Sequence, residues 1–427
     1  MKYLIFILSV FLSFPGYAGN YDCPALLEDK TYKDQKDLRY TFEEADGWLF
    51  RTNDFKETLS FNDLAKNHYT ELNQVLKSKN IDLVVVPIPP RAMTHEAMQN
   101  RNGYDRTKAI AAYYDLISKI RQTGIKVAEI GDFKGKTDFF YKRDHHWTAF
   151  GAKYMAEMTA RQIKSLPIYA SLPKKTFKTE KTGEEEQKRK IATFVEDVCG
   201  KEIPPEMAAV YSTYADGADD LLGDESVPDV LLVGTSHSVN DVSKGNFDGF
   251  LKEATGLDIE NRAISGGGVD SALLSWLASP DYQVRQPKIL IWEFPVHQNY
   301  SSPKLFHQLI PAIYGDCVDK PYLSADGTFD KRTVQIFSHI SEKKINAENT
   351  HLVFKVPETK KRKFKAFFEF EDGSVKEFEF RRSKVDERHG TYFYRFTKED
   401  MVVPVKNLKI EMQEDVTGSA TVRVCRR

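Results

Sequence analysis

The stretch DVLLVGTSHS, residues 229–238, determines how the rest of the chain is interpreted. Its first half is apolar without alternation, which is typical of a strand covered on both faces and so of a parallel sheet. A turn with Gly234 follows directly. Ser236 is therefore expected at the carboxyl end of this strand, where open α/β sheets carry their sites. A helix N-cap serine is the alternative interpretation of Ser236.

Similar segments lie on both sides of this stretch. IDLVVVPIPP (81–90), IKVAEIGDF (125–133) and KILIWEFPVH (288–297) have strand length, and AIAAYYDLISKIRQTG (109–124) has helical spacing. Strands that alternate with helices predict an α/β domain with a mainly parallel sheet. The charged segment 174–190 is weakly patterned, and we interpret it as a solvated helix face or an exposed connection.

After Cys317 the pattern changes to short alternating strands. KFKAFFEF and VKEFEF flank the turn EDGS (371–374), which is a strong hairpin signal. TYFYRF (391–396), NLKIEM (407–412) and SATVRV (419–424) continue the pattern. We predict an antiparallel β-sandwich.

The chain begins MKYLIFILSVFLSFPGYAGN, and this start predicts a secretory signal peptide cleaved after Ala18. Its apolar run is well short of the ~20 residues that a spanning helix needs. With 427 residues the chain exceeds one typical domain. We therefore expect a signal peptide (1–18), an α/β domain (19–317) and a β-sandwich (318–427).

Four cysteines are far apart and form no CxxC pair, so two disulfides in an oxidising compartment are expected rather than a zinc site. Three pairings are possible. We favour Cys23–Cys199 with Cys317–Cys425, because each would close one domain. Four buried free thiols are the alternative.

The chain has 61 Lys and Arg and 62 Asp and Glu. This near-zero net charge does not indicate a protein that binds nucleic acid. Residues 318–427 hold 23 Lys and Arg against 18 Asp and Glu, an excess of five positive charges. That excess would suit an anionic polymer, and it is also compatible with an ordinary surface.

The motif RDHHW, residues 143–147, supplies an acid and a base. Asp144 can accept a histidine ring N–H, orient the ring and stabilise its charged form when the other nitrogen takes the proton of Ser236. Two alternatives are a metal site on Asp144, His145 and His146, and histidines that hydrogen-bond in a core.

A third motif is RAISGGGVDS, residues 262–271. Gly266, Gly267 and Gly268 would let backbone amides approach a bound atom, and could complete an oxyanion hole with the Ser236 amide. An ordinary loop is the alternative.

Taken in order, DGWLF (46–50), PIPPRA (87–92), RDHHW, GTSHS and IWEFP (291–295) behind a signal peptide resemble the AlgX-like alginate O-acetyltransferase family. The resemblance implies an SGNH-hydrolase-like domain followed by a carbohydrate-binding β-sandwich. By position in the family motifs it makes Ser236 the nucleophile, His146 the base and Asp144 its partner.

The resemblance also implies a function. We expect a periplasmic, monomeric enzyme that acetylates hydroxyls of an anionic polysaccharide such as alginate through an acetyl-serine. Membrane-associated proteins of acetyl donation and polymer export are the expected partners. We expect no cofactor, no metal and no nucleic acid.

The C-terminal module contains no tryptophan, so sugar contacts there would need other side chains. Six residues are candidates for polysaccharide binding: Lys384, Arg388, Tyr392, Tyr394, Arg395 and Lys398. The alternative is that the aromatic residues belong to the core of the module.

Three other functions remain open. An acetylesterase would use the same residues with water as acceptor, a scaffold of an export complex would bind polysaccharide without catalysis, and a metal-dependent hydrolase would use Asp144 and His145.

Overall fold

The computed structural model describes the chain from Cys23 to Arg427 with internal gaps. The described ranges are 23–39, 42–44, 47–99, 103–187, 190–215, 228–338, 349–360, 363–382, 390–396 and 405–427. The expected signal peptide, residues 1–18, lies outside the described residues.

A five-stranded parallel sheet forms the centre of the α/β domain, with the strand order β4-β3-β9-β7-β8. The strands are β3 (Asp82–Ile88), β4 (Lys126–Val127), β7 (Val230–Val233), β8 (Ile259–Asn261) and β9 (Ile289–Pro295). The inner strands β7 and β9 are buried along their whole length because both faces are covered. The predicted α/β fold is confirmed.

The α/β domain also contains helices. They are α1 (Asp63–Ser78), α2 (Arg91–Thr94), α3 (Arg106–Arg121), α4 (Ala149–Lys164), α5 (Lys190–Cys199), α6 (Asn240–Ser243), α7 (Phe247–Thr255), α8 (Ser271–Leu277), α9 (Pro280–Val284) and α10 (Pro303–Tyr314). Side-chain N-caps fix where the long ones begin: Asn62, Asp105 and Thr148 each accept a backbone N–H of the first turn. Helix α1 packs on α10, and α4 packs on α7.

The order of the strands determines where a site can form. Strand β9 comes last in the sequence but lies between β3 and β7. The carboxyl ends of β3, β9 and β7 therefore meet at one edge, and the segments that follow these strands lie side by side there.

Two antiparallel ribbons of two strands each flank the domain: β1 (Phe42–Glu44) with β2 (Trp48–Phe50), and β5 (Phe177–Gln187) with β6 (Glu206–Ala215). Most of the β5 side chains are exposed. The segment 174–190 thus contains a strand and is not the helix face that we considered. Its exposure on both faces explains why its sequence lacks alternation.

The C-terminal module is an antiparallel sandwich, as predicted. One sheet has the order β10-β17-β12-β15 and the other β11-β16-β13-β14. The strands are β10 (Leu323–Thr328), β11 (Thr333–Ser338), β12 (Thr350–Lys355), β13 (Lys363–Phe370), β14 (Val375–Arg381), β15 (Thr391–Tyr394), β16 (Val405–Met412) and β17 (Ser419–Arg426). The hairpin β13–β14 closes through the Asp-Gly turn, where Gly373 has a φ of 81°.

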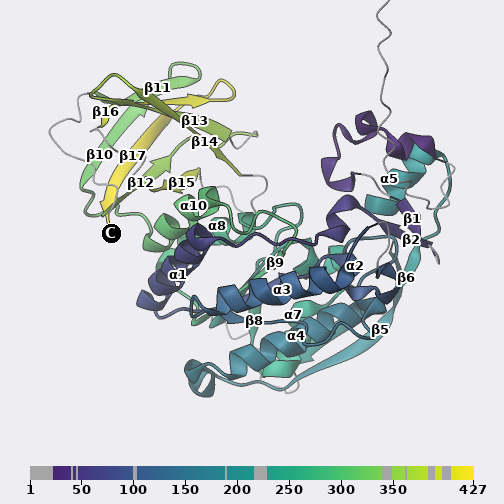
Figure 1. Cartoon of the computed structure of the whole chain (residues 1–427). Coiled ribbons are helices and arrows are strands. Elements are labelled where there is room, and N and C mark those ends of the chain that lie inside the picture. Colours follow the sequence, from purple (N-terminus) through teal and green to yellow (C-terminus); the bar gives the residue numbers. More distant parts are fainter. Residues whose placement is uncertain are drawn as a thin grey trace, which may run out of the picture.

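The sandwich packs against the α/β domain through β15 and α10 (Figure 1). Phe393 of β15 belongs to the hydrophobic core of the α/β domain, and the Arg395 N–H donates to the His307 carbonyl at 3.0 Å. A Cys317–Cys425 disulfide lies at this junction, and a Cys23–Cys199 disulfide ties the N-terminal segment to α5. This is the pairing that we favoured from the sequence.

Among the helices that the structure describes, none combines the length and the hydrophobicity required to cross a bilayer.

Candidate active site

Ser236 lies on the turn that follows β7, at the edge of the sheet where the sequence places it. It opens a short 3-10 helix, Ser236–Ser238. Gly234 is needed just before it, because a Cβ there would lie 2.6 Å from Oε2 of Glu293. The strand, the close approach at Gly234 and the helical turn together present the serine at the end of the sheet.

His146 connects Ser236 with Asp144. Its Nε2 lies 2.8 Å from the Oγ of Ser236, and its Nδ1 contacts Oδ1 of Asp144. The His146 backbone N–H also donates to that carboxylate, at 2.8 Å. Since the Nδ1–H donates to Asp144, the lone pair of Nε2 faces the serine hydroxyl. The three residues have the arrangement that activates a serine nucleophile.

Asp144 carries its charge in a buried position, with 1% of its surface exposed. Burial alone would raise the pKa of this carboxyl. The His146 imidazole, its hydrogen bonds and the Arg91 guanidinium outweigh that effect and hold the pKa below its usual value. A charged carboxylate is the partner that a protonated imidazole needs.

His145 takes a different place. Its ring packs on that of His146, with centroids 4.0 Å apart, and its backbone carbonyl accepts a hydrogen bond from Nε2 of His237 at 3.2 Å. Burial, and then the neighbouring His146 and Arg51, hold its pKa well below 6.5, so this imidazole is neutral at neutral pH. The structure brings His146, and not His145, to the serine.

Asp144, His145 and His146 also each place one metal-ligand atom within 4.8 Å of the others. His146, however, directs Nδ1 to Asp144 and Nε2 to Ser236. An ion held by His146 would displace one of these contacts. The geometry therefore favours acid–base chemistry over metal binding at this motif.

Glu293 stabilises the turn that carries Ser236 through hydrogen bonds. It lies in β9, the middle strand, and is fully buried. Its Oε2 accepts the Thr235 N–H at 2.8 Å and the Ser238 hydroxyl at 2.9 Å. Burial raises the pKa of Glu293 to about 7 despite these hydrogen bonds. The sequence signal of this role is an ionisable residue inside the otherwise apolar strand IWEFP. From the sequence we assigned Glu293 no role.

A chain of hydrogen bonds continues from Glu293 towards the histidines. Nε2 of His237 must carry a proton, because the His145 carbonyl that it faces can only accept. Burial, then His146 and His297, hold the His237 pKa well below 6.5, so Nδ1 is an acceptor for the Thr235 hydroxyl 3.1 Å away. The same hydroxyl lies 2.9 Å from Glu293 Oε1 and donates to it when Glu293 is charged. Because the hydroxyl has one proton, it can serve both neighbours only when Glu293 is protonated and donates to it. The chain is satisfied when Glu293 is neutral.

Arg91, in PIPPRA, joins two of the sequence motifs. Its buried guanidinium donates to the carbonyls of Leu49 (2.7 Å), Tyr141 (2.6 Å) and Lys142 (3.0 Å), and to Asp54 (3.0 Å). Although burial raises the pKa of Asp54, nearby guanidiniums hold it at about 2, so the pair is charged. Arg91 thus fixes the strand of DGWLF against the loop that carries RDHHW.

The glycine loop lies next to the serine turn. Its leading residue Ile264 donates a backbone hydrogen bond to the Gly234 carbonyl at 3.0 Å. Gly266 and Gly268 have φ angles of 74° and 71°, which glycine adopts at little cost. Gly267 approaches Ser271 so closely that a Cβ would lie 2.8 Å from the Cβ of that serine. Their participation in an oxyanion hole remains a prediction.

Three of the residues expected to bind polysaccharide are buried. Tyr392 and Tyr394 pack on Phe380 within the sandwich, and Arg395 forms an ion pair with Glu71 of α1. The prediction for these three is wrong, because β15 has one face in the sandwich core and the other against the α/β domain. Three further candidates, Lys384, Arg388 and Lys398, lie outside the described residues.

The fold and the geometry at Ser236 define a protein of the SGNH-hydrolase-like class. Residues 43–296 match the family model described as the SGNH hydrolase-like domain of the acetyltransferase AlgX. The match covers more than half of the chain, and the protein belongs to this family.

Individual relatives agree. The alginate biosynthesis protein AlgX of Pseudomonas syringae pv. tomato is 27% identical over 95% of this chain and 88% of its own length. AlgX of Pseudomonas aeruginosa is 33% identical over 71% of this chain and 67% of its own length. A solved structure of P. aeruginosa AlgX superposes with a TM-score of 0.85, over 95% of this chain and 99% of that chain at 27% identity. The similarity therefore includes both domains.

Proposed function

We propose that the protein transfers acetyl groups to hydroxyls of an exopolysaccharide in the periplasm, with mannuronate residues of alginate as acceptors. The observation that carries the proposal is the 2.8 Å distance between His146 Nε2 and Ser236 Oγ, with charged Asp144 behind the imidazole. Membership of an acetyltransferase family supports the chemistry, and the alginate biosynthesis relatives support the polymer.

In the first half-reaction, His146 Nε2 takes the Ser236 proton while Oγ attacks the acetyl carbonyl of the donor. The tetrahedral oxyanion is held by the Ser236 amide and the 266–268 loop. When the bond to the donor breaks, the leaving group takes the proton from His146. The products are acetyl-Ser236 and a neutral imidazole.

In the second half-reaction, a sugar hydroxyl gives its proton to His146 Nε2 and attacks the acetyl-serine. Collapse of the second tetrahedral intermediate releases the acetylated sugar, and the proton returns to Ser236 Oγ. Asp144 stabilises the imidazolium in both halves and stays ionised. The acetyl group reaches the serine from membrane-associated donor proteins, as the family resemblance implies.

The test is mass spectrometry of mannuronate oligomers incubated with the purified protein and an activated acetyl ester. Acetylated oligomers are expected with the wild type and not with Ser236→Ala. Serine-dependent hydrolysis of the donor without a gain on the oligomer would instead indicate an acetylesterase. No serine-dependent reaction, together with normal polymer acetylation in cells that carry Ser236→Ala, would indicate a non-catalytic scaffold.

A further inference from the structure

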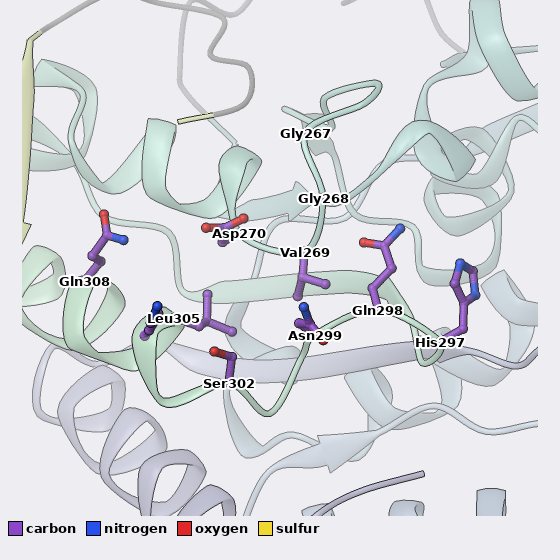
Figure 2. Close-up of a pocket in the computed structure, with 11 residues that line it drawn as sticks. Gly267, Gly268, Val269, Asp270, His297, Gln298, Asn299, Ser302, Leu305 and Gln308 are labelled. Atoms are coloured by element: carbon purple, nitrogen blue, oxygen red, sulfur yellow. The ribbon is translucent and has the colours of Figure 1, made fainter. Parts of the chain in front are cut away.

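A cavity of about 450 Å³ lies at the carboxyl edge of the sheet, between the glycine loop and the segment that follows β9. One wall is the glycine loop from Gly267 to Asp270, and the other is the segment from His297 to Gln308 that leads into α10 (Figure 2). Its volume falls in the range of ligand sites, about 300–1,000 Å³. The Nε1–H of Trp292 donates to the Val269 carbonyl at 2.9 Å and anchors the glycine wall to the sheet.

One end of the cavity, at His297, lies on the side of the proposed catalytic residues. Figure 2 shows His297 at this end and Gln308 at the other. His297 lies close enough to His145 and His237 to lower the pKa of both, and both rings pack on His146. Strands β7 and β9 are neighbours, so the segments that follow them leave the same edge. A ligand in the cavity would therefore reach towards Ser236.

The lining suits a polyhydroxylated ligand. Gln298, Asn299 and Gln308 offer carboxamides that both donate and accept, and Ser302 adds a hydroxyl. Oε1 of Gln308 is buried and has no hydrogen-bond partner among the described residues. Val269 offers apolar surface for the C–H faces of a sugar ring.

The charges of the lining suit an anionic sugar. Lys304 is an exposed lysine on the wall and can meet a carboxylate without the cost of burying its ammonium. Burial raises the pKa of Asp270, while the Arg382 guanidinium acts in the opposite direction. The positive charge of Arg382 offsets part of the field of the Asp270 carboxylate, so this acid repels an anionic ligand less than it would alone.

The far end of the cavity points to the junction between the two domains. Gln308 belongs to α10, which packs on β15 of the sandwich. Asp270, on the opposite wall, lies within the electrostatic reach of Arg382 at the end of β14. A chain longer than the cavity would continue along this junction.

We infer that the cavity is the acceptor subsite, where the rings of a uronate polymer lie with a carboxylate at Lys304 and a hydroxyl directed to Ser236. The inference rests on the proposed transfer to a polysaccharide and adds the place and charge class of the acceptor. It assigns polymer recognition to the α/β domain, whereas the sequence had suggested the C-terminal module.

Binding of mannuronate oligomers to Ser236→Ala protein, measured by calorimetry, tests the subsite without catalysis. In that background, Asn299→Trp should fill the cavity and weaken binding by at least about tenfold. Lys304→Gln should weaken binding about 2–5-fold, as expected for an exposed ion pair. Neutral mannose oligomers should show no such loss with Lys304→Gln.

The matched control is Lys153→Gln, because Lys153 is an exposed lysine in a second concavity of about 440 Å³, lined by α4 and β6. Circular dichroism and thermal melting establish that each variant is folded. In the Ser236-containing protein, Asn299→Trp should raise the KM for the oligomer.

These experiments distinguish a failure of the transferase proposal from a failure of the subsite proposal. If the protein transfers no acetyl group but binds the oligomer, and Asn299→Trp removes this binding, the subsite is supported and the transferase proposal is refuted. Unchanged binding in both cavity variants, or a loss that Lys153→Gln alone produces, overturns the subsite whatever the activity of the wild type.

Discussion

Replacing Glu293 by glutamine is expected to stabilise the α/β domain at neutral pH and to leave its stability in acid nearly unchanged. Burial raises the pKa of Glu293 from 4.5 to about 7 in the folded protein. Between these values the folded protein keeps a proton that the unfolded chain has released. The free energy of unfolding of the wild type therefore falls as the pH rises through this window.

The magnitude follows from the width of the window. Each pH unit between the two pKa values corresponds to about 1.4 kcal/mol, so the wild type loses about 3 kcal/mol from pH 4.5 to about pH 8. Glutamine does not titrate, and its amide can reproduce the contacts of the neutral acid. Its carbonyl accepts from the Thr235 N–H and the Ser238 hydroxyl, and its NH₂ donates to the Thr235 Oγ. The stability difference between variant and wild type should grow by about 3 kcal/mol.

Urea unfolding followed by tryptophan fluorescence, at a series of pH values, measures this difference. The tryptophans are Trp48, Trp147, Trp276 and Trp292. All four are buried in the α/β domain, so the signal reports the domain that contains Glu293. Glu253→Gln, on the exposed surface of α7, is the control for removal of a charge. A difference that stays constant, or shrinks as the pH rises, would refute the reasoning.

Three further predictions concern the same site. His146→Ala should reduce acetyl transfer by about 10⁴-fold, while His145→Ala should cost far less, since only His146 contacts the serine; equal losses in steady-state rates would contradict the assignment of the base. Arg91→Lys should lower the free energy of unfolding by about 3–5 kcal/mol, because one ammonium cannot replace the guanidinium at three carbonyls and Asp54. A loss below about 1 kcal/mol in urea titrations would show that these hydrogen bonds of Arg91 contribute little to stability. Dialysis against a chelator should leave serine-dependent turnover unchanged, and recovery of lost activity by added zinc would revive the metal interpretation.

Much of the arrangement of residues at the sheet edge was predictable because its signals are local. An apolar run followed by a glycine turn places Ser236 at the end of a strand, whatever that strand pairs with. Asp144 and His146 are two residues apart, so their contact needs no tertiary information. The 2.8 Å approach of His146 to Ser236 joins residues 90 positions apart. The motifs suggested a histidine base for the serine, and the family resemblance indicated that this base is His146.

The errors arose where one pattern allows two environments. The alternation of TYFYRF predicts a strand, and the structure has β15 there, but alternation does not say what covers its second face. The sandwich core buries Tyr392 and Tyr394 on one face of β15, and packing against the α/β domain buries Phe393 and Arg395 on the other side. The sequence analysis missed the strand β5 for the opposite reason. A strand without a buried face has no periodic pattern from which it could be recognised.

By itself, therefore, the sequence determined the two fold classes, the serine turn and the pairing of Asp144 with His146, because each follows from side-chain periodicity or from neighbours along the chain. Only the tertiary structure shows which residues hold the serine turn and the motif of Asp144 and His146 in place. Glu293 reaches the serine turn only because β9 inserts between β3 and β7, and Arg91 joins its motifs only where the loops converge. It also decided the cavity, whose walls come from segments brought together by the order of the strands. Such contacts depend on how distant elements pack, and local patterns carry no record of that packing.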